Sequence, residues 1–247
     1  MNYIIYDLEF NQRDPNIPKD DASNVKELPF EIIQIGAIKL DETFNIVSKF
    51  NTLINPTVYT TIHPYVEKLT KINSEMLSSC ESFPKIYKDF LKFVGDDEAI
   101  FCVWGKVDIK ELLRNIKYYN LSTSLISKYY IDVQESASKY FKVEKGCKIG
   151  LKNAVELLGI LNEDEFHDAY YDAYYTSEVF KRIYNEDIKP RIYTTNLSRK
   201  MSNKKKTIDS VALIREFEKI YNRKMTKEEQ DIIKLAYLMG KTNQFVK

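Results

Sequence analysis

The chain has 247 residues, of which 44% are hydrophobic and 30% charged, and its net charge is +1. This near-neutral balance gives no global basic field, so a polyanionic partner would need a local patch or bound metal to attract it. No apolar stretch approaches the roughly 20 residues that span a membrane, and the first residues resemble a strand rather than a signal peptide. We therefore expect a cytoplasmic protein.

Cysteine and histidine usage limits the metal chemistry. Cys80, Cys102 and Cys147 are widely separated and lack Cys-x-x-Cys spacing, so neither a disulfide framework nor a zinc site is expected. His63 and His167 are the only two histidines, which excludes a multi-histidine site. A metal site must therefore consist of carboxylates, whose hard oxygen ligands favour Mg²⁺ or Mn²⁺.

The N-terminal part predicts three antiparallel strands. Residues 3–6 form a short apolar and aromatic run that is typical of a buried strand. Residues 32–40 are rich in β-branched side chains, and residues 44–54 alternate between apolar and polar. A turn at residues 41–42 would join these two strands as a hairpin.

The middle of the chain predicts alternating helices and strands. A loop containing Pro56 and Pro64 is expected first, and a helix should begin at Asn73. Apolar residues with a spacing of three and four predict an amphipathic helix over 83–94. The strand–helix–strand order that follows predicts a parallel pair of strands, with the elements at 99–104, 108–119 and 128–133. Further helices are expected at about 134–141, 150–158 and 169–184.

This order of elements predicts an α/β fold. The sheet would be mixed and five-stranded, with three antiparallel and two parallel strands flanked by helices, which is the RNase H-like pattern. Residues 1–187 would form this domain, and 188–247 a basic linker with a helical C-terminal extension. The segment 189–206 contains seven Lys or Arg residues and no acidic residue. Helices are expected at about 207–221 and 226–239, and the second would open with a capping box.

The first candidate chemical group is the pair Asp7 and Glu9, at the end of the first apolar run. Side chains alternate between the two faces of a strand, so these carboxylates share one side. Two carboxylates so close raise each other's pKa, and a divalent cation between them removes that cost. By itself, an Asp-x-Glu pair also fits an ordinary polar strand end.

Asp108 is the second candidate. The preceding strand ends at Trp104, Gly105 permits a tight turn, and Asp108 opens a helix. The residue thus faces the carboxyl end of a sheet strand, where the ligand sites of α/β proteins cluster. A helix N-cap explains an aspartate at this position equally well.

His167 and Asp172 are the third candidate group. His167 precedes the longest predicted helix, and Asp172 lies one turn inside it, where Ala169 and Ala173 allow close packing against the sheet. Asp168 competes with Asp172 as a metal ligand. We favour Asp172 and interpret Asp168 as a charge that complements the helix dipole. In isolation, His167 also fits a surface or capping histidine.

Taken in order, Asp-x-Glu, a central Asp and His-x4-Asp resemble the signature of the DEDD exonuclease superfamily, histidine branch (DEDDh, DnaQ-like). The resemblance extends over about residues 1–185 and includes all five signature residues, Asp7, Glu9, Asp108, His167 and Asp172. Similarity is greatest to the subgroup of Eri-type RNA exonucleases and sporulation-inhibitor-type exonucleases. The stretches that support it are 7–11, 31–37, 69–72, 104–108 and 150–154.

This resemblance implies a metal-dependent 3′→5′ exonuclease that hydrolyses single-stranded RNA or DNA and releases nucleoside 5′-monophosphates. Two Mg²⁺ or Mn²⁺ ions would clamp the scissile phosphate, lower the pKa of a bound water and stabilise the leaving oxygen. Asp7 would bridge both ions. Glu9 and Asp172 would hold the ion that carries the attacking water, and Asp108 would support the second ion. His167 would take the proton of the water as general base.

Substrate contacts are also implied by the resemblance. Phe10 would contact the terminal nucleotide, and Leu69 with Ile72 would wedge against its base, a kind of contact that tolerates any sequence. Trp104 is a further candidate, although Leu69, Ile72 and Trp104 fit core packing as well. The basic run 189–206 would either follow the phosphate backbone or serve as a solvated linker, which we favour.

Other classes of function fit the sequence less well. A catalytically silent nucleic-acid-binding module is disfavoured because the metal and base residues are all present, and an adaptor protein would act through the helical tail. A glycosidase needs two carboxylates, and four acids with a histidine exceed that need. The sequence does not distinguish RNA from DNA, and it indicates neither protein partners nor oligomeric state.

Overall fold

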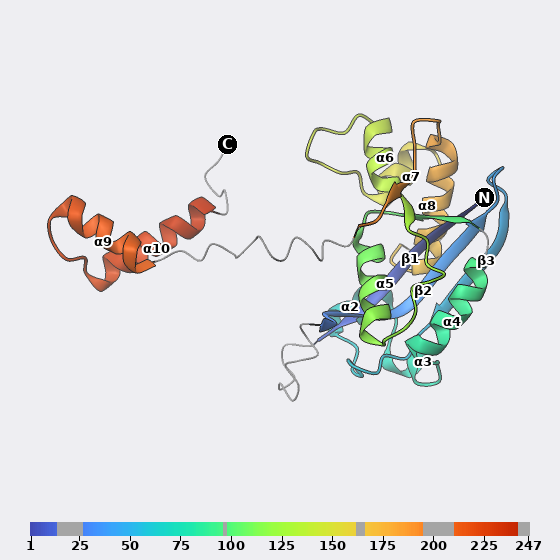
Figure 1. Ribbon diagram of the computed structural model, residues 1–247, viewed down its shortest axis with the longest axis horizontal. Coiled ribbons are helices and arrows are strands. Elements are labelled where there is room, and N and C mark those ends of the chain that lie inside the picture. Colours follow the sequence, from blue (N-terminus) through green and yellow to red (C-terminus); the bar gives the residue numbers. More distant parts are fainter. Residues whose placement is uncertain (14–26, 96–97, 162–165, 195–209, 242–247) are drawn as a thin grey trace. The chain divides into compact units, whose positions relative to one another are not determined.

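A mixed sheet with the strand order β3-β2-β1-β4-β5-β6 organises the first of two units, Met1–Tyr193 and Thr194–Lys247, in the computed structural model (Figure 1). The structure describes residues 1–13, 27–95, 98–161, 166–194 and 210–241. The strands are β1 (Asn2–Gln12), β2 (Phe30–Leu40), β3 (Ile46–Leu53), β4 (Ala99–Val103), β5 (Tyr129–Asp132) and β6 (Arg191–Ile192). The helices of this unit are α2 (Pro64–Thr70), α3 (Ser74–Ser78), α4 (Phe83–Val94), α5 (Val107–Tyr118), α6 (Val133–Tyr140), α7 (Leu151–Leu157) and α8 (Ala169–Ile183).

The expected mixed sheet is confirmed, but the described residues form six strands and not the expected five. β1, β2 and β3 pair in antiparallel fashion, whereas β4 is parallel to both β1 and β5. The two-residue strand β6 was not predicted, and it pairs antiparallel with β5 inside the segment predicted to be linker. Arg191 also donates two hydrogen bonds to the Glu135 carboxylate, at 2.9 and 2.7 Å. Such a short strand has no periodicity of its own and forms because an edge strand offers unpaired backbone groups.

Helix α2 corrects the expectation of a loop through Pro64. Proline is well suited to the first helical position because its fixed φ matches the helix and its missing N–H would be unpaired there. The preceding His63 caps the helix, since its Nδ1 accepts a hydrogen bond from the Tyr65 N–H at 3.1 Å. The expected helix start at Asn73 is confirmed, because Asn73 caps α3 through the Met76 N–H at 2.9 Å.

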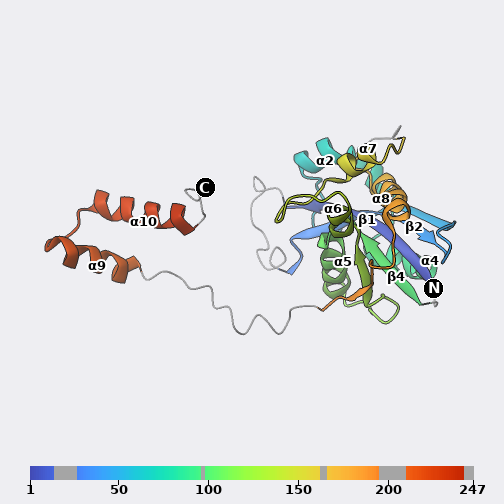
Figure 2. The ribbon, with the colours of Figure 1, turned by 90° about the horizontal axis from the view of Figure 1, so that it is seen from above.

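Alternation along β1 assigns its side chains to two cores on opposite faces of the sheet. Ile4, Tyr6 and Leu8 pack with residues of α4 and α5, whereas Tyr3 and Ile5 pack with residues of α6, α7 and α8. Figure 2 shows α5 and α8 on opposite sides of the sheet. Asp7 and Glu9 continue the odd-numbered series, so they face the layer that contains α8.

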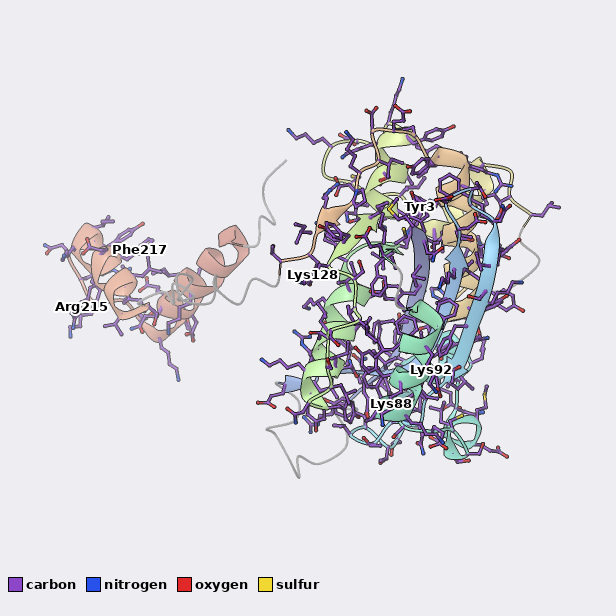
Figure 3. All side chains as sticks on the ribbon, turned by 45° about the vertical axis from the view of Figure 1, so that its right-hand side comes forward. Tyr3, Lys88, Lys92, Lys128, Arg215 and Phe217 are labelled. Atoms are coloured by element: carbon purple, nitrogen blue, oxygen red, sulfur yellow. The ribbon has the colours of Figure 1, made fainter. Side chains whose placement is uncertain are left out.

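Helix α4 is amphipathic, as its sequence predicts. Phe83, Ile86 and Phe90 are buried in the core. Lys88 and Lys92 occupy the outer side of the helix, where both are exposed (Figure 3).

Asp7 and Glu9 lie inside a strand and not at its end, which corrects the earlier interpretation. β1 continues to Gln12, paired with β2 throughout, but its pairing with β4 ends at Ile5 opposite Cys102. The two acids therefore occupy a stretch of β1 that has a neighbouring strand on one side only. A register shift between Glu9 and Phe10 marks a bulge, a feature that is common beside active sites.

The second unit contains helices α9 (Ser210–Tyr221) and α10 (Lys227–Lys241). The predicted capping box is confirmed: the Thr226 N–H donates to Glu229 at 2.8 Å, and the Glu229 N–H donates to the Thr226 hydroxyl at 3.3 Å. Of the basic run, the residues 195–206 lie outside the described part of the chain. Within the described ranges, no helix is both long and apolar enough to cross a membrane.

Candidate active site

Three carboxylates from two distant parts of the chain converge on one point. One ligand oxygen each from Asp7, Glu9 and Asp172 lies within 4.8 Å of the other two. Asp7 and Glu9 come from β1, and Asp172 comes from the first turn of α8. All three side chains are half-buried. The predicted convergence of these acids is therefore present in the fold.

Gly36 explains how α8 approaches the sheet closely enough. Gly36 is the cross-strand partner of Asp7, so the two residues point to the same face. A Cβ at Gly36 would lie 2.1 Å from the carbonyl carbon of Ala169 and 2.2 Å from the Tyr170 nitrogen. A larger residue is excluded at this position, and the start of α8 rests directly on the backbone beside Asp7.

Asp108 reaches the same region from the opposite layer. It lies in the first turn of α5, is only 6% exposed, and is not the helix cap, because Lys106 occupies that position. Gly105 makes the turn before it with φ +93°, a conformation that L side chains rarely adopt. Repulsion from Asp108 contributes to the raised pKa of both Asp7 and Glu9. The fourth predicted acid therefore belongs to the same electrostatic cluster.

Burial and mutual repulsion raise the pKa of all four carboxyls. Burial is the largest cause in each case. It raises the pKa of Asp172 to about 6, that of Asp108 to about 7 and that of Glu9 to about 9. Burial also holds the pKa of Asp7 well above its ordinary value, with repulsion from Asp108, Asp172 and Glu9 adding to the effect. Full ionisation of the cluster is therefore unfavourable in the folded chain without a compensating cation.

The cluster has the properties that a divalent cation requires. Among the described residues, Oδ1 of Asp172 is buried without a hydrogen-bond partner. A buried carboxylate oxygen without a donor is costly, and a bound cation offsets that cost. An all-oxygen set of ligands suits Mg²⁺ or Mn²⁺. The residues present therefore fit a divalent metal.

His167 and Asp168 occupy the entry to α8. His167 adopts φ +72°, a left-handed conformation, and its backbone N–H donates to Oδ2 of Asp172 at 3.3 Å. Its side chain is exposed. Asp168 is the N-cap of α8, since Oδ1 accepts hydrogen bonds from the N–H groups of Tyr170 at 2.9 Å and Tyr171 at 3.3 Å. This confirms Asp168 as a residue of the helix N-terminus.

The residues predicted to contact substrate differ in accessibility. Phe10 is half-buried, and its ring lies 6.0 Å from that of Phe30, centroid to centroid. Leu69 and Trp104 are also half-buried. Ile72 is only 3% exposed and packs in a core cluster beneath α2 and α3. Three of the four side chains therefore retain a surface that a ligand could contact.

Three buried polar residues organise the loops around the site, and no role was predicted for them. Asn11 binds the segment before α2, donating to the Tyr59 carbonyl at 2.8 Å and accepting from the His63 N–H at 3.0 Å. The Glu31 carboxylate accepts hydrogen bonds from the backbone of residues 57–59. Gln34 contacts the start of α8. All three lie in the stretches 7–11 and 31–37, which resemble the exonuclease family, and this resemblance is the sequence feature that could have indicated their importance.

With this geometry, the chain has the fold and acidic cluster of a nuclease, and comparison with known proteins defines the family. The sequence profile of the RNase T exonuclease family matches residues 4–180. The chain belongs to this exonuclease family and is a hydrolase of phosphodiester bonds. The resemblance to DEDDh exonucleases that the sequence indicated is thereby confirmed. Enzymes of this type use divalent metal ions, and the acidic cluster described above is a candidate site for them.

Individual relatives are distant in sequence. The chain is 29% identical over 156 residues to DNA polymerase III subunit epsilon of Aquifex aeolicus (strain VF5), an alignment that covers 63% of this chain and 73% of the relative.

Solved structures share the fold. The nuclease domain of 3′hExo, a DEDDh family member bound to rAMP, superposes with a TM-score of 0.64 at 19% identity, covering 78% of this chain and 96% of that domain. Exonuclease I of E. coli in complex with a dT13 oligonucleotide gives a TM-score of 0.58 at 17% identity, covering 74% of this chain and 40% of the exonuclease. The expected RNase H-like exonuclease fold is confirmed.

Proposed function

We propose that the chain removes nucleotides one at a time from the 3′ end of single-stranded RNA or DNA, releasing nucleoside 5′-monophosphates in a reaction that needs two Mg²⁺ or Mn²⁺ ions. The observation that carries this proposal is the convergence of Asp7, Glu9 and Asp172 within 4.8 Å, with Asp108 in the same cluster. The structural relatives support it, because their ligands are rAMP and an oligonucleotide.

The four carboxylates would divide the binding of metal between them. Asp7, which interacts with all three of the other acids, would bridge the two positions. Glu9 and Asp172 would complete one position, and Asp108 would support the other from α5. Divalent ions bound there would offset the charge of the scissile phosphodiester and promote ionisation of the attacking water.

His167 would accept the proton from the attacking water. The exposed side chain of His167 can exchange that proton with solvent. The backbone N–H of the same residue donates to Oδ2 of Asp172 at 3.3 Å, which supports a shared role for the two residues. A left-handed residue at this point is consistent with a conformation selected for function.

The half-buried apolar side chains would contact the terminal nucleotide. We assign base contacts to Phe10, Leu69 and Trp104, which keep an accessible surface. Ile72 is almost fully buried, so we assign it to packing beneath α2 and α3. Contacts of this kind stabilise a base without reading its identity.

Digestion of matched single-stranded RNA and DNA tests the proposal. Each strand is labelled at the 5′ end in one reaction and at the 3′ end in another, with Mg²⁺, Mn²⁺ or EDTA. We expect a descending ladder from the 5′ label, immediate mononucleotide release from the 3′ label and no product in EDTA. The Asp7→Asn variant, checked for folding by circular dichroism, should be inactive. Mononucleotide released first from the 5′ label, or full activity of Asp7→Asn, would contradict the proposal.

A further inference from the structure

The buried side chain of Gln34 connects β2, the strand paired with the Asp7 and Glu9 segment of β1, to the start of α8. It is 2% exposed and is the cross-strand partner of Glu9. Its Nε2 donates to Oδ2 of Asp168 at 3.1 Å and to Oδ1 of Asn51 at 3.0 Å. Its Oε1 accepts the Ala169 N–H at 3.2 Å. We propose that Gln34 is a positioning residue, which sets the placement of His167 and Asp172 relative to Glu9 by fixing the first residues of α8.

The hydrogen bonds determine the orientation of the Gln34 amide. The Ala169 N–H can only donate, so the oxygen of Gln34 must face it. Oδ2 of Asp168 accepts the other hydrogen bond, so the nitrogen of Gln34 must face that side chain. Rotation of the amide by 180° would create two mismatches at once. Opposite an aspartate at position 168, the side chain at position 34 must therefore supply one donor and one acceptor, and glutamine supplies both.

The consequence for the active site follows from chain connectivity. Asp168 and Ala169 lie between His167 and Asp172, and the Asp172 N–H donates to the Asp168 carbonyl at 2.9 Å. Movement at the helix start would shift both the base and the ligand. Gly36 lets α8 approach the sheet, and the hydrogen bonds of Gln34 fix the position of the first residues of α8 along β2. Misplacement of a catalytic group by about 1 Å can cost on the order of a hundredfold in rate.

This inference rests on the proposed function for its kinetic test, so a second measurement is independent of activity. Gln34→Met keeps the length of the side chain and removes its hydrogen bonds. We expect kcat to fall by about tenfold to a hundredfold with little change in KM. Amide hydrogen exchange at Ala169 and Tyr170 should accelerate by at least about tenfold in the metal-free protein. Asn51→Ala is the matched control, because it removes the contact of Gln34 to β3 and leaves both contacts to α8.

Exchanging the donor and acceptor groups of Gln34 and Asp168 distinguishes a role of their hydrogen bond from a role of side-chain packing. Asp168→Asn places an amide donor opposite Nε2 of Gln34, and Gln34→Glu places a carboxylate opposite Asp168, so each single variant should be impaired. In the double variant Gln34→Glu/Asp168→Asn, the new carboxylate accepts from both the Ala169 N–H and the Asn side chain. Its kcat and its exchange at Ala169 should lie closer to wild type than the product of the two single effects.

Three results would overturn the inference: wild-type exchange at Ala169 in Gln34→Met, equal losses in Asn51→Ala and Gln34→Met, or a double variant with purely multiplicative losses. If the wild-type chain lacked nuclease activity, the proposed function would fail, but the exchange measurements would still decide the role of Gln34.

Discussion

Asp7 lies directly opposite Gly36 in the β1–β2 ladder, and the missing side chain of Gly36 is the space into which the backbone of Ala169 fits. Because the cross-strand partner of Asp7 has no Cβ, a helix can lie beside this acid instead of one side-chain layer away. Asp172, one turn into that helix, thereby comes within 4.8 Å of Asp7 and Glu9. The close backbone contact and the acidic cluster are therefore parts of the same arrangement.

Gly36→Ala should damage both stability and activity. The added Cβ would overlap backbone atoms of Ala169 and Tyr170, which cannot rotate away as a flexible side chain could. We expect a loss of about 1–3 kcal/mol in the free energy of unfolding and a fall in kcat of at least about tenfold. Denaturant unfolding and nuclease assays measure the two effects. Gly150→Ala is the control, because a Cβ there meets nothing within 4 Å; equal effects of the two substitutions would refute the argument.

The metal-free chain should lose stability as pH rises. In the unfolded chain the acids ionise near their ordinary pKa, whereas burial raises the folded pKa to about 6 for Asp172, about 7 for Asp108 and about 9 for Glu9. Between the ordinary pKa and the raised pKa of each acid, the folded state binds more protons than the unfolded state. The stability that the protonated acids contribute is therefore complete at acidic pH and declines towards about pH 9. Thermal unfolding across this range in EDTA should show the decline, and Mg²⁺ should reduce it.

Glu9→Gln provides the control for that pH dependence. Glutamine has a similar shape and no charge to bury, so the metal-free variant should unfold at a higher temperature than wild type in the alkaline part of the range. The difference should vanish in acid, where Glu9 is protonated. A variant that is less stable than wild type at high pH would show that ionised Glu9 does not destabilise the folded chain.

His167→Asn separates the proposed role of the His167 side chain as a base from the role of its backbone N–H, which binds Asp172. Asparagine tolerates the left-handed conformation at φ +72° and keeps the backbone N–H that binds Asp172, but it cannot act as the base. We expect kcat to fall by about 10²–10⁴-fold, while the Mg²⁺ concentration needed for half-maximal activity stays close to wild type. Unchanged kcat would remove His167 from the mechanism, and a large change in Mg²⁺ dependence would assign it to metal binding.

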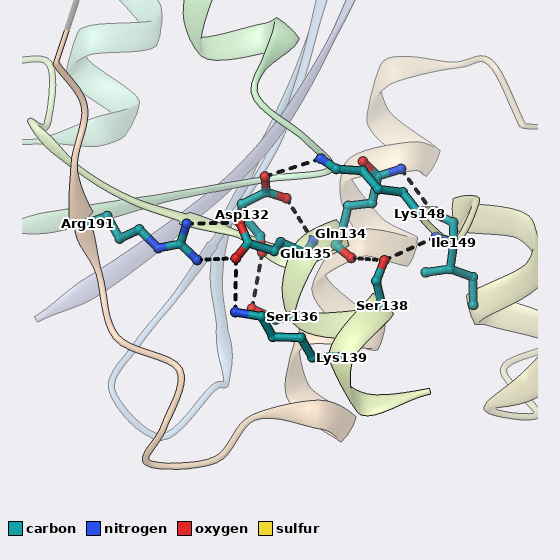
Figure 4. Close-up of polar contacts among 9 residues, drawn as sticks. All are labelled: Asp132, Gln134, Glu135, Ser136, Ser138, Lys139, Lys148, Ile149 and Arg191. Atoms are coloured by element: carbon teal, nitrogen blue, oxygen red, sulfur yellow. Dashed lines mark hydrogen bonds and ion pairs between the residues drawn. The ribbon is translucent and has the colours of Figure 1, made fainter. Parts of the chain in front are cut away.

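Arg191→Ala should release the end of the first unit without affecting catalysis. The guanidinium of Arg191 forms two hydrogen bonds with Glu135 on α6 (Figure 4), and this pairing lowers the pKa of Glu135 to about 2. Both side chains are partly exposed, so we expect a loss of only about 0.5–1 kcal/mol. Faster hydrogen exchange at the Tyr193 N–H, which donates to the Lys128 carbonyl at 2.9 Å, is the sensitive measure. A strong loss of nuclease activity would contradict this structural role.

The same pair has its own pH signature. A lowered carboxyl pKa stabilises the folded state above the ordinary pKa of glutamate, and this stabilisation is lost as pH falls towards about 2. The difference in unfolding temperature between wild type and Arg191→Ala should therefore shrink in acid.

Local patterns predicted most elements of the first unit. The amphipathic spacing over 83–94 matches α4 residue for residue, and alternation along β1 correctly placed Asp7 and Glu9 on one face. Expectations were wrong where a local signal was overridden or overlooked. Proline at position 64 predicts a loop, but this residue opens α2. The polar residues that interrupt the apolar run predict a strand end at Asp7 and Glu9, but pairing with β2 extends the strand to Gln12.

The sequence by itself determined the periodicities, the Thr226/Glu229 capping box and the identity of the family, since these depend on residues a few positions apart or on an ordered set of motifs. Only the tertiary structure decided that Asp172 meets Asp7 and Glu9, that Gly36 admits the α8 backbone, and that Gln34 holds Ala169 from 135 positions away. The physical reason is that such contacts arise from packing of the sheet against α8, whose free energy depends on the whole core and leaves no periodic trace in either segment.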